Sequence, residues 1–171
     1  ADLSEEEADK VISYLEDGGK AIIFTDYTTT DIPNLKKVLD NYGVTPDDGI
    51  VMEGDSKHYI MQIPYYLVPE INSTDITSDL IEDNRFVLMP VAQSIRILDS
   101  YRDTLNIETI LSTSDSAYIK TDVENMKTFE KESGDQEGKF NLGVCVTEDI
   151  SDEKQTQVVY YGSSSLLDST T

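Results

Sequence analysis

Between Ser4 and Gly18 the chain carries its apolar side chains at the spacing of a single helix face, at Ala8, Val11, Ile12 and Leu15. Positions i, i+3, i+4 and i+7 lie on one side of an α-helix, so this spacing predicts an amphipathic helix. Ser4 and Glu7 stand at the spacing of a capping box, in which each side chain bonds the backbone N–H of the other residue. Gly18 and Gly19 end the predicted helix, because glycine readily adopts the left-handed conformation found after a helix terminus.

The apolar run Ala21-Ile22-Ile23-Phe24 follows directly after the two glycines. Because the run is continuous rather than alternating, it predicts a strand buried on both faces, as in a parallel sheet. A second helix is predicted over residues 33–42, with Pro33 in its first turn and Gly43 at its end. Helices that alternate with buried strands favour a three-layer α/β domain.

The rest of the chain contains more predicted strands than helices. Further strands are predicted over residues 50–52, 86–89, 94–98, 107–111, 142–146 and 157–161. Two prolines interrupt residues 59–71, so any strand there is broken or lies at an edge, and a short helix is expected within 75–81. The polar segment 121–139 predicts a solvated loop with a short helix over 123–129. The strand-only stretch makes the expected sheet mixed, though mostly parallel.

The charge of the chain is strongly one-sided and excludes one class of partner. The 171 residues fit one domain, and 34 acidic against 13 basic side chains give a net charge of -21. Such a charge repels nucleic acid and anionic lipid, so we expect no nucleic-acid partner. With one cysteine and one histidine, the chain offers no thiolate-rich or histidine-rich metal site, and we expect neither a metal nor a cofactor.

No convincing catalytic set is present, and we predict that the protein is not an enzyme. Cys145 lies in Gly143-Val144-Cys145-Val146-Thr147, which is half of a nucleophile elbow but lacks the second small residue and the helix that must follow. We interpret Cys145 as a buried strand residue. The alternative function is a hydrolase or an amidotransferase-like enzyme that uses Cys145, with His58 as its base, or a serine of the loop 163–165.

Tyrosine is frequent, with ten copies against four phenylalanines and no tryptophan. Tyr59, Tyr65 and Tyr66 cluster in the proline-interrupted segment. Exposed tyrosine rings suit the recognition of sugars or of protein surfaces, because they give a large contact area at a low entropy cost. A carbohydrate-binding surface domain is therefore a further alternative.

Several segments in order resemble one family. These are Tyr14 to Lys20 (with the Asp17-Gly18-Gly19 turn) and residues 33–35, 42–44, 48–51, 86–95, 111–114 and 158–165. Together they resemble the extracytoplasmic domain of GldG-type ABC-transporter auxiliary proteins, linked to gliding motility. The resemblance implies a flavodoxin-like or class I glutamine amidotransferase-like fold without catalytic groups. It also implies an ABC permease and ATPase as partners and a location at the extracytoplasmic face of the cell membrane.

On this interpretation, residues 1–171 form a single extracytoplasmic domain of a longer membrane-anchored protein, whose membrane helices lie outside the sequence. No apolar run approaches the roughly 20 residues that span a bilayer. The domain would act by binding a small ligand, a glycan or a partner protein. Ligands of open α/β sheets bind at the carboxyl ends of the strands. We therefore predict a binding site at Asp26, Tyr27 and Thr28, with Ser163 and Ser164 as neighbours.

Overall fold

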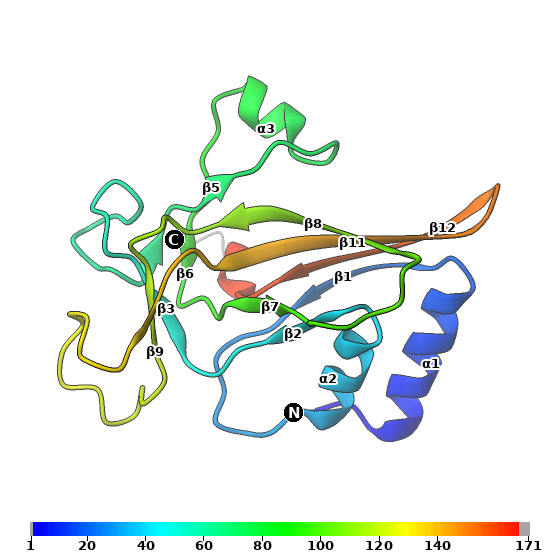
Figure 1. Ribbon diagram of the computed structural model, residues 1–171, viewed down its shortest axis with the longest axis horizontal. Coiled ribbons are helices and arrows are strands. Elements are labelled where there is room, and N and C mark those ends of the chain that lie inside the picture. Colours follow the sequence, from blue (N-terminus) through cyan, green and yellow to red (C-terminus); the bar gives the residue numbers. More distant parts are fainter. Residues whose placement is uncertain (1, 168–171) are drawn as a thin grey trace.

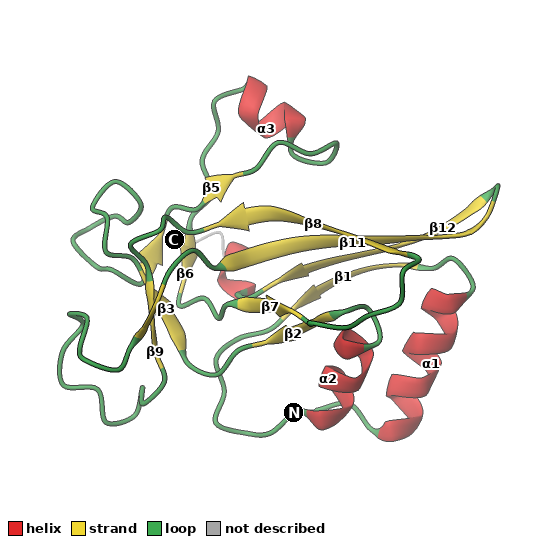
Figure 2. Cartoon of the chain, viewed as in Figure 1, coloured by secondary structure: helices red, strands yellow, loops and turns green. Residues whose placement is uncertain are grey.

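The computed structural model describes residues 2–167 as a mostly β domain with helices beside a curled sheet (Figures 1 and 2). Strands make up 32% of the chain and helices 17%. The large sheet curls into a half-barrel of mixed strand direction, and two small antiparallel sheets lie beside it. The predicted three-layer, flavodoxin-like or amidotransferase-like architecture is therefore wrong.

The large sheet has seven strands. Its main path runs β1 (Lys20–Phe24), β12 (Lys154–Tyr161), β11 (Asn141–Ser151), β7 (Ile95–Ile97) and β2 (Val44–Pro46), while β8 (Leu105–Ser112) pairs with β11 and with β5 (Glu70–Ile71). Only the β1–β12 pair is parallel among the described pairs of this sheet. The expectation of a mostly parallel sheet fails because β11 and β12 form a hairpin, which requires antiparallel pairing.

Two small sheets flank the half-barrel. One joins β10 (Gln136–Glu137), β9 (Tyr118–Lys120) and β3 (Ile50–Met52), and the other joins β4 (Tyr66–Leu67) and β6 (Met89–Pro90). The helices are α1 (Glu5–Glu16), α2 (Pro33–Asp40), the short α3 (Ser78–Glu82) and a 3-10 turn, η1 (Ser164–Leu167). No helix within residues 2–167 is long and apolar enough to cross a membrane.

The two N-terminal helices agree with the sequence pattern. Ser4 accepts a hydrogen bond from the Glu7 N–H, and the Glu7 carboxylate accepts one from the Ser4 N–H, so the capping box is confirmed. Ala8 and Leu15 of α1 are fully buried. Helices α1 and α2 pack against each other on one side of the half-barrel, where they cover an apolar core that includes β11 and β12 side chains (Figure 1).

The strand predicted at residues 21–24 exists, but it is not buried on both faces. Ala21 and Ile23 pack into the core beneath the helices. Ile22 points to the other face and is 66% exposed. A continuous apolar run therefore did not indicate a doubly covered strand here, because helices cover only one face of β1.

Two further local predictions are wrong. The strand expected over residues 86–89 is reduced to Met89–Pro90, and Phe86 is 75% exposed. No helix forms at 123–129. The segment 121–139 is largely exposed, as predicted, and it is anchored where buried Lys120 bonds the carboxylates of Glu132 and Asp135 at 2.8 and 2.7 Å.

Candidate functional site

The loop that follows β1 lies beside the loop that follows β12. These strands are parallel neighbours, so both loops leave the same end of the sheet. The Asp26 carboxylate accepts hydrogen bonds from the Ser164 N–H at 2.8 Å and from the Ser164 hydroxyl at 2.6 Å. The structure thus brings these two predicted residues together. Their polar groups bond to each other, so fewer of them remain for a ligand.

The remaining predicted residues differ in accessibility. Ser163 is fully buried, and its hydroxyl donates to the Pro90 carbonyl at 2.7 Å, so it holds the loop rather than facing a ligand. Tyr27 packs against the cluster of Ile50, Met52 and Tyr118. Thr28 is exposed and lines a cavity.

That cavity is a polar pocket of about 290 Å³ between the loop after β1 and the end of β2. The lining residues are Thr28, Thr29, Thr30, Asp31, Ile32, Lys36, Pro46, Asp47, Asp48 and Gln93. We call it the threonine pocket. The site therefore lies at the predicted end of β1, but most of its lining comes from residues that the sequence did not indicate.

Gln93 is the most informative residue of the threonine pocket. It is only 6% exposed, and its side-chain N–H donates to the Asp47 carbonyl at 3.1 Å. Its Oε1 atom is buried and has no hydrogen-bond partner among the described residues. Buried polar atoms normally find partners, so Oε1 is an unsatisfied acceptor beside the pocket, although it has no contact with solvent.

Negative charge dominates the pocket. The Asp47 carboxylate already accepts from the Ser94 hydroxyl at 2.5 Å and from Arg96 at 2.9 Å. Asp48 and Asp31 are exposed, and the lysine of the pocket, Lys36, lies 4.0 Å from Asp31. Carboxylates therefore outnumber cations among the lining residues, and the pocket favours a ligand group that carries N–H donors and a positive charge.

A signal for this pocket was present in the sequence. The Pro46-Asp47-Asp48-Gly49 turn is a marked polar break after a short apolar segment. What the sequence could not indicate is that β2, unrecognised as a strand, places this turn opposite the loop after β1. Gln93 gave no signal, because only the packing shows that its oxygen is unpaired.

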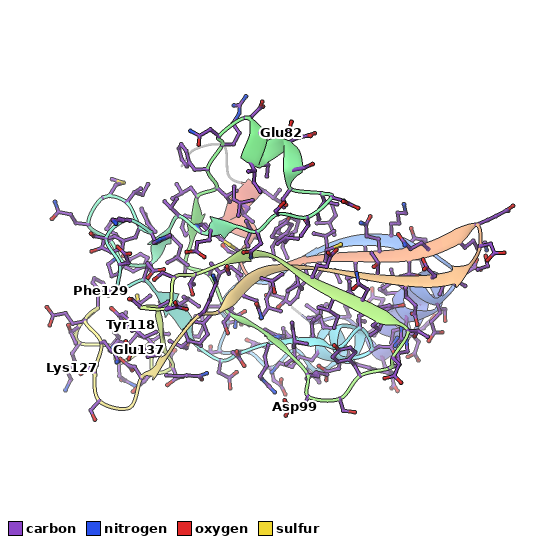
Figure 3. The ribbon with its side chains drawn as sticks, turned by 45° about the horizontal axis from the view of Figure 1, so that its top comes forward. Glu82, Asp99, Tyr118, Lys127, Phe129 and Glu137 are labelled. Carbon is purple, nitrogen blue, oxygen red and sulfur yellow. The ribbon has the colours of Figure 1, made fainter. Side chains whose placement is uncertain are left out.

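A second cavity, of about 460 Å³, has aromatic walls. Its lining residues are Glu53, Gly54, Tyr59, Gln62, Pro64, Tyr118, Phe129, Glu130 and Lys131. Figure 3 shows Tyr118 and Phe129 together near the loop 121–139. The Phe129 ring is 46% exposed and packs edge-to-face on Tyr65 at 5.2 Å between ring centroids. We call this cavity the aromatic cleft.

The floor of the aromatic cleft includes a buried carboxylate. Glu53 is 2% exposed and accepts hydrogen bonds from the Ser114 hydroxyl at 2.6 Å, the Ser114 N–H at 3.0 Å and the Asp55 N–H at 3.1 Å. These donors compensate the negative charge without a cation. Gln62, on the rim, has a left-handed φ of 60°, a conformation that non-glycine residues seldom adopt.

Cys145 and His58 lie in different surroundings. Cys145 is buried in the middle of β11, and its sulfur accepts a long hydrogen bond from Gln157 at 3.6 Å. Burial raises the pKa of the Cys145 thiol, which disfavours the reactive thiolate. The His58 ring instead faces the Val68 carbonyl at 3.4 Å and Glu70 at 3.9 Å. This geometry does not favour the cysteine hydrolase alternative.

Metal-binding side chains are scattered over the described part of the chain. Within residues 2–167, no group of three or more histidine, cysteine, aspartate or glutamate side chains is placed to hold a metal ion.

Comparison with family models and with curated protein sequences finds no match. Among solved structures, the N-terminal domain of mmIFT52 has a similar fold, with a TM-score of 0.65 over 99% of this chain. The two sequences are 11% identical, so the likeness concerns the fold alone. This chain spans 64% of that chain's length.

These findings overturn the expected family. A similar solved structure is an mmIFT52 domain, and no comparison supports a GldG-type ABC-transporter protein. An ABC permease and ATPase as partners, and an extracytoplasmic location, rested on that resemblance and stay predictions.

Proposed function

We propose that this protein is a non-enzymatic binding domain that receives a basic side chain of a partner protein in the threonine pocket. The observation that carries the proposal is the lining of the pocket, which holds three carboxylates and one lysine. A guanidinium or ammonium group would supply N–H donors and a positive charge. It would also meet the exposed carboxylates of Asp31 and Asp48.

The size of the threonine pocket supports a side chain rather than a whole small molecule. Its volume is about 290 Å³. Sites for small-molecule ligands usually measure about 300–1,000 Å³, so this pocket lies at the lower limit of that range. The net charge of -21 further favours a basic partner, because the field of the whole protein attracts cations and speeds their association.

A titration with a minimal probe tests this proposal. Nitrogen-15-labelled protein is titrated with Nα-acetyl-arginine amide and followed by two-dimensional NMR. We expect shifts in the backbone amides of Thr28 to Thr30 and in the side-chain amide of Gln93, with a dissociation constant of about 1–10 mM. The citrulline analogue has nearly the same shape without the charge and should produce no such shifts.

Matched variants locate the effect. Asp48→Asn should weaken the arginine probe about fivefold, because it removes one carboxylate from the pocket. Asp99→Asn removes an exposed carboxylate far from the pocket and should change the affinity less than about twofold. Equal responses to arginine and citrulline, or shifts confined to other surfaces, would contradict the proposal.

The aromatic cleft favours a second candidate function, recognition of a carbohydrate. Sugar rings stack on aromatic faces while their hydroxyls bond to carboxylate and amide groups, and the cleft combines both kinds of group. Binding to a glycan array should then be lost in Phe129→Ala. It should persist in Phe86→Ala, which removes an exposed ring outside the cleft. An array with no bound glycan, or equal binding by both variants, would contradict this candidate.

A further inference from the structure

Strand β1 forms one end of the main path of the large sheet. It pairs with β12 on one side, and among the described strands none pairs with its other side. An unpaired strand edge is a template for another strand, and proteins usually protect such edges with charge, bulges or a covering segment.

The hydrogen bonds at both ends of β1 show which residues face outward. The Thr25 N–H donates to the Tyr161 carbonyl at 3.1 Å, and the Gly19 carbonyl accepts from the Gln157 N–H at 3.3 Å. Backbone groups alternate in direction along a strand, so residues 19, 21, 23 and 25 face β12. The N–H and C=O groups of Lys20, Ile22 and Phe24 therefore point away from the sheet.

The outward N–H and C=O groups of Lys20 already have a hydrogen-bond partner within the chain. The Tyr14 hydroxyl accepts from the Lys20 N–H and donates to the Lys20 carbonyl, both at 3.2 Å. It therefore stands where a neighbouring strand would stand. No hydrogen bond from residues 2–167 reaches the outward N–H and C=O groups of Ile22 and Phe24.

The side chains beside this edge are apolar and continue into a cavity. Ile22 is 66% exposed on the face away from the helices, and Phe24 lies two residues farther along on the same face. Phe24 stacks on Tyr161 at 5.3 Å between ring centroids. It also lines an apolar cavity of about 220 Å³, whose other lining residues include Ile76, Leu80, Val87 and Leu166.

We propose that the outer edge of β1 accepts an extended segment of a partner protein as an additional strand of the half-barrel. Four backbone groups, on Ile22 and Phe24, would give the added strand its hydrogen bonds. Ile22, Phe24 and the adjoining apolar cavity would select apolar side chains at alternate positions of that segment. This goes beyond the proposed function, since it assigns a different surface with a different recognition mode.

Charge decides which occupant fits. Two copies of this chain would bring together two net charges of -21, which repel each other. A segment with lysine or arginine between its apolar residues instead complements the acidic domain and steers association. We therefore assign the edge to a basic, alternating segment of another protein.

A peptide library provides the probe. Twelve-residue peptides displayed on phage, with no fixed positions, are selected on the intact protein, and the enriched peptides are synthesised. We expect apolar residues at alternate positions with lysine or arginine between them. Peptide binding should slow hydrogen exchange of the Ile22 and Phe24 amides, because both become bonded to the added strand.

Variants separate this edge from other surfaces. Ile22→Lys should weaken the selected peptides about tenfold or more, since it places a charge at the centre of the apolar surface. Ile150→Lys adds the same charge at a position 40% exposed on β11 and should change the affinity less than about twofold. Arginine-probe binding at the threonine pocket should be unchanged in both variants, so the two proposals fail separately.

Three results would overturn the assignment. The first is a selection in which no alternating peptide is enriched, and the second is equal peptide binding by wild type and Ile22→Lys. The third is self-association in sedimentation that Ile22→Lys abolishes, because it would give the edge to a second copy instead of a partner.

Discussion

The Tyr14 hydroxyl holds both the N–H and the C=O of Lys20, at 3.2 Å each, and so closes the first position of the outer edge of β1. Gly19 makes this approach feasible. A Cβ at residue 19 would lie 2.5 Å from the Tyr14 carbonyl oxygen and 2.5 Å from its ring. The helix–Gly-Gly–strand junction therefore does more than end α1, because it also sets how much of the β1 edge is open.

Tyr14→Phe should lengthen the open edge by one residue. The ring is 58% exposed and its hydroxyl bonds are long, so we expect the unfolding free energy to change by less than about 0.5 kcal/mol. Exchange of the Lys20 amide should become faster, and peptides selected on the β1 edge should bind about threefold more tightly. Tyr101→Phe, at a ring 42% exposed outside β1, is the control. Weaker peptide binding by Tyr14→Phe would mean that this hydroxyl belongs to the binding surface.

The ion pair between Arg102 and Glu148 should be a measurable stabilising contact. Arg102 donates two hydrogen bonds to the Glu148 carboxylate, at 2.8 and 2.6 Å, and lies over the Tyr42 ring at 5.0 Å. Glu148 is 8% exposed. Glu148→Gln should lower the unfolding free energy by about 1–3 kcal/mol at neutral pH, as measured by urea unfolding.

The same pair predicts a pH dependence. The hydrogen bond from Arg102 holds the pKa of Glu148 below the ordinary value of about 4.5 for a glutamate. A carboxylate whose pKa is lower in the folded state than in the unfolded state stabilises the fold when it is ionised. This contribution is complete above the unfolded pKa of about 4.5 and is lost as the pH falls through the folded pKa. The difference between wild type and Glu148→Gln should therefore shrink from pH 7 to pH 3. A constant difference would contradict this assignment, and Glu153→Gln, an exposed acid, serves as the control.

Lys120 should control how tightly the segment 121–139 is held. Its side chain is 5% exposed and pairs with Glu132 and Asp135. Lys120→Met should leave both carboxylates without their cation and open the segment. Cleavage by glutamyl endopeptidase within 121–139 should then accelerate about tenfold, because proteolysis follows the population of the open form. Lys10→Met, on the exposed face of α1, should leave cleavage there unchanged.

Features that depend on contacts between residues close together in the chain could be predicted from the sequence, whereas features that depend on distant contacts could not. The helix α1 was predictable because its cap and its apolar spacing are local, within four residues of each other. The position of β1 was predictable for the same reason, but its neighbours were not. A run such as Ala21 to Phe24 fits a central strand and an edge strand equally well, and only the pairing with β12 decides between them.

The candidate site shows the same limit. Asp26 and Thr28 were predictable from their place after β1, and Ser164 from its place after β12. Gln93 was not predictable, because its side chain is placed by a hydrogen bond to Asp47, which lies 46 positions away in the chain. The fold class failed for a different reason. Ten residues without a predicted helix separate the predicted strands 142–146 and 157–161, which is too short for a parallel crossover, so the connection length itself favoured a hairpin.

The central claim is that β1 offers an open edge, and amide hydrogen exchange in the free protein tests it most directly. We predict slow exchange at Ala21 and Ile23, which bond to β12, and exchange about a hundredfold faster at Ile22 and Phe24. Uniform protection along residues 21–24 would contradict the claim, because it would require a partner that already covers this edge.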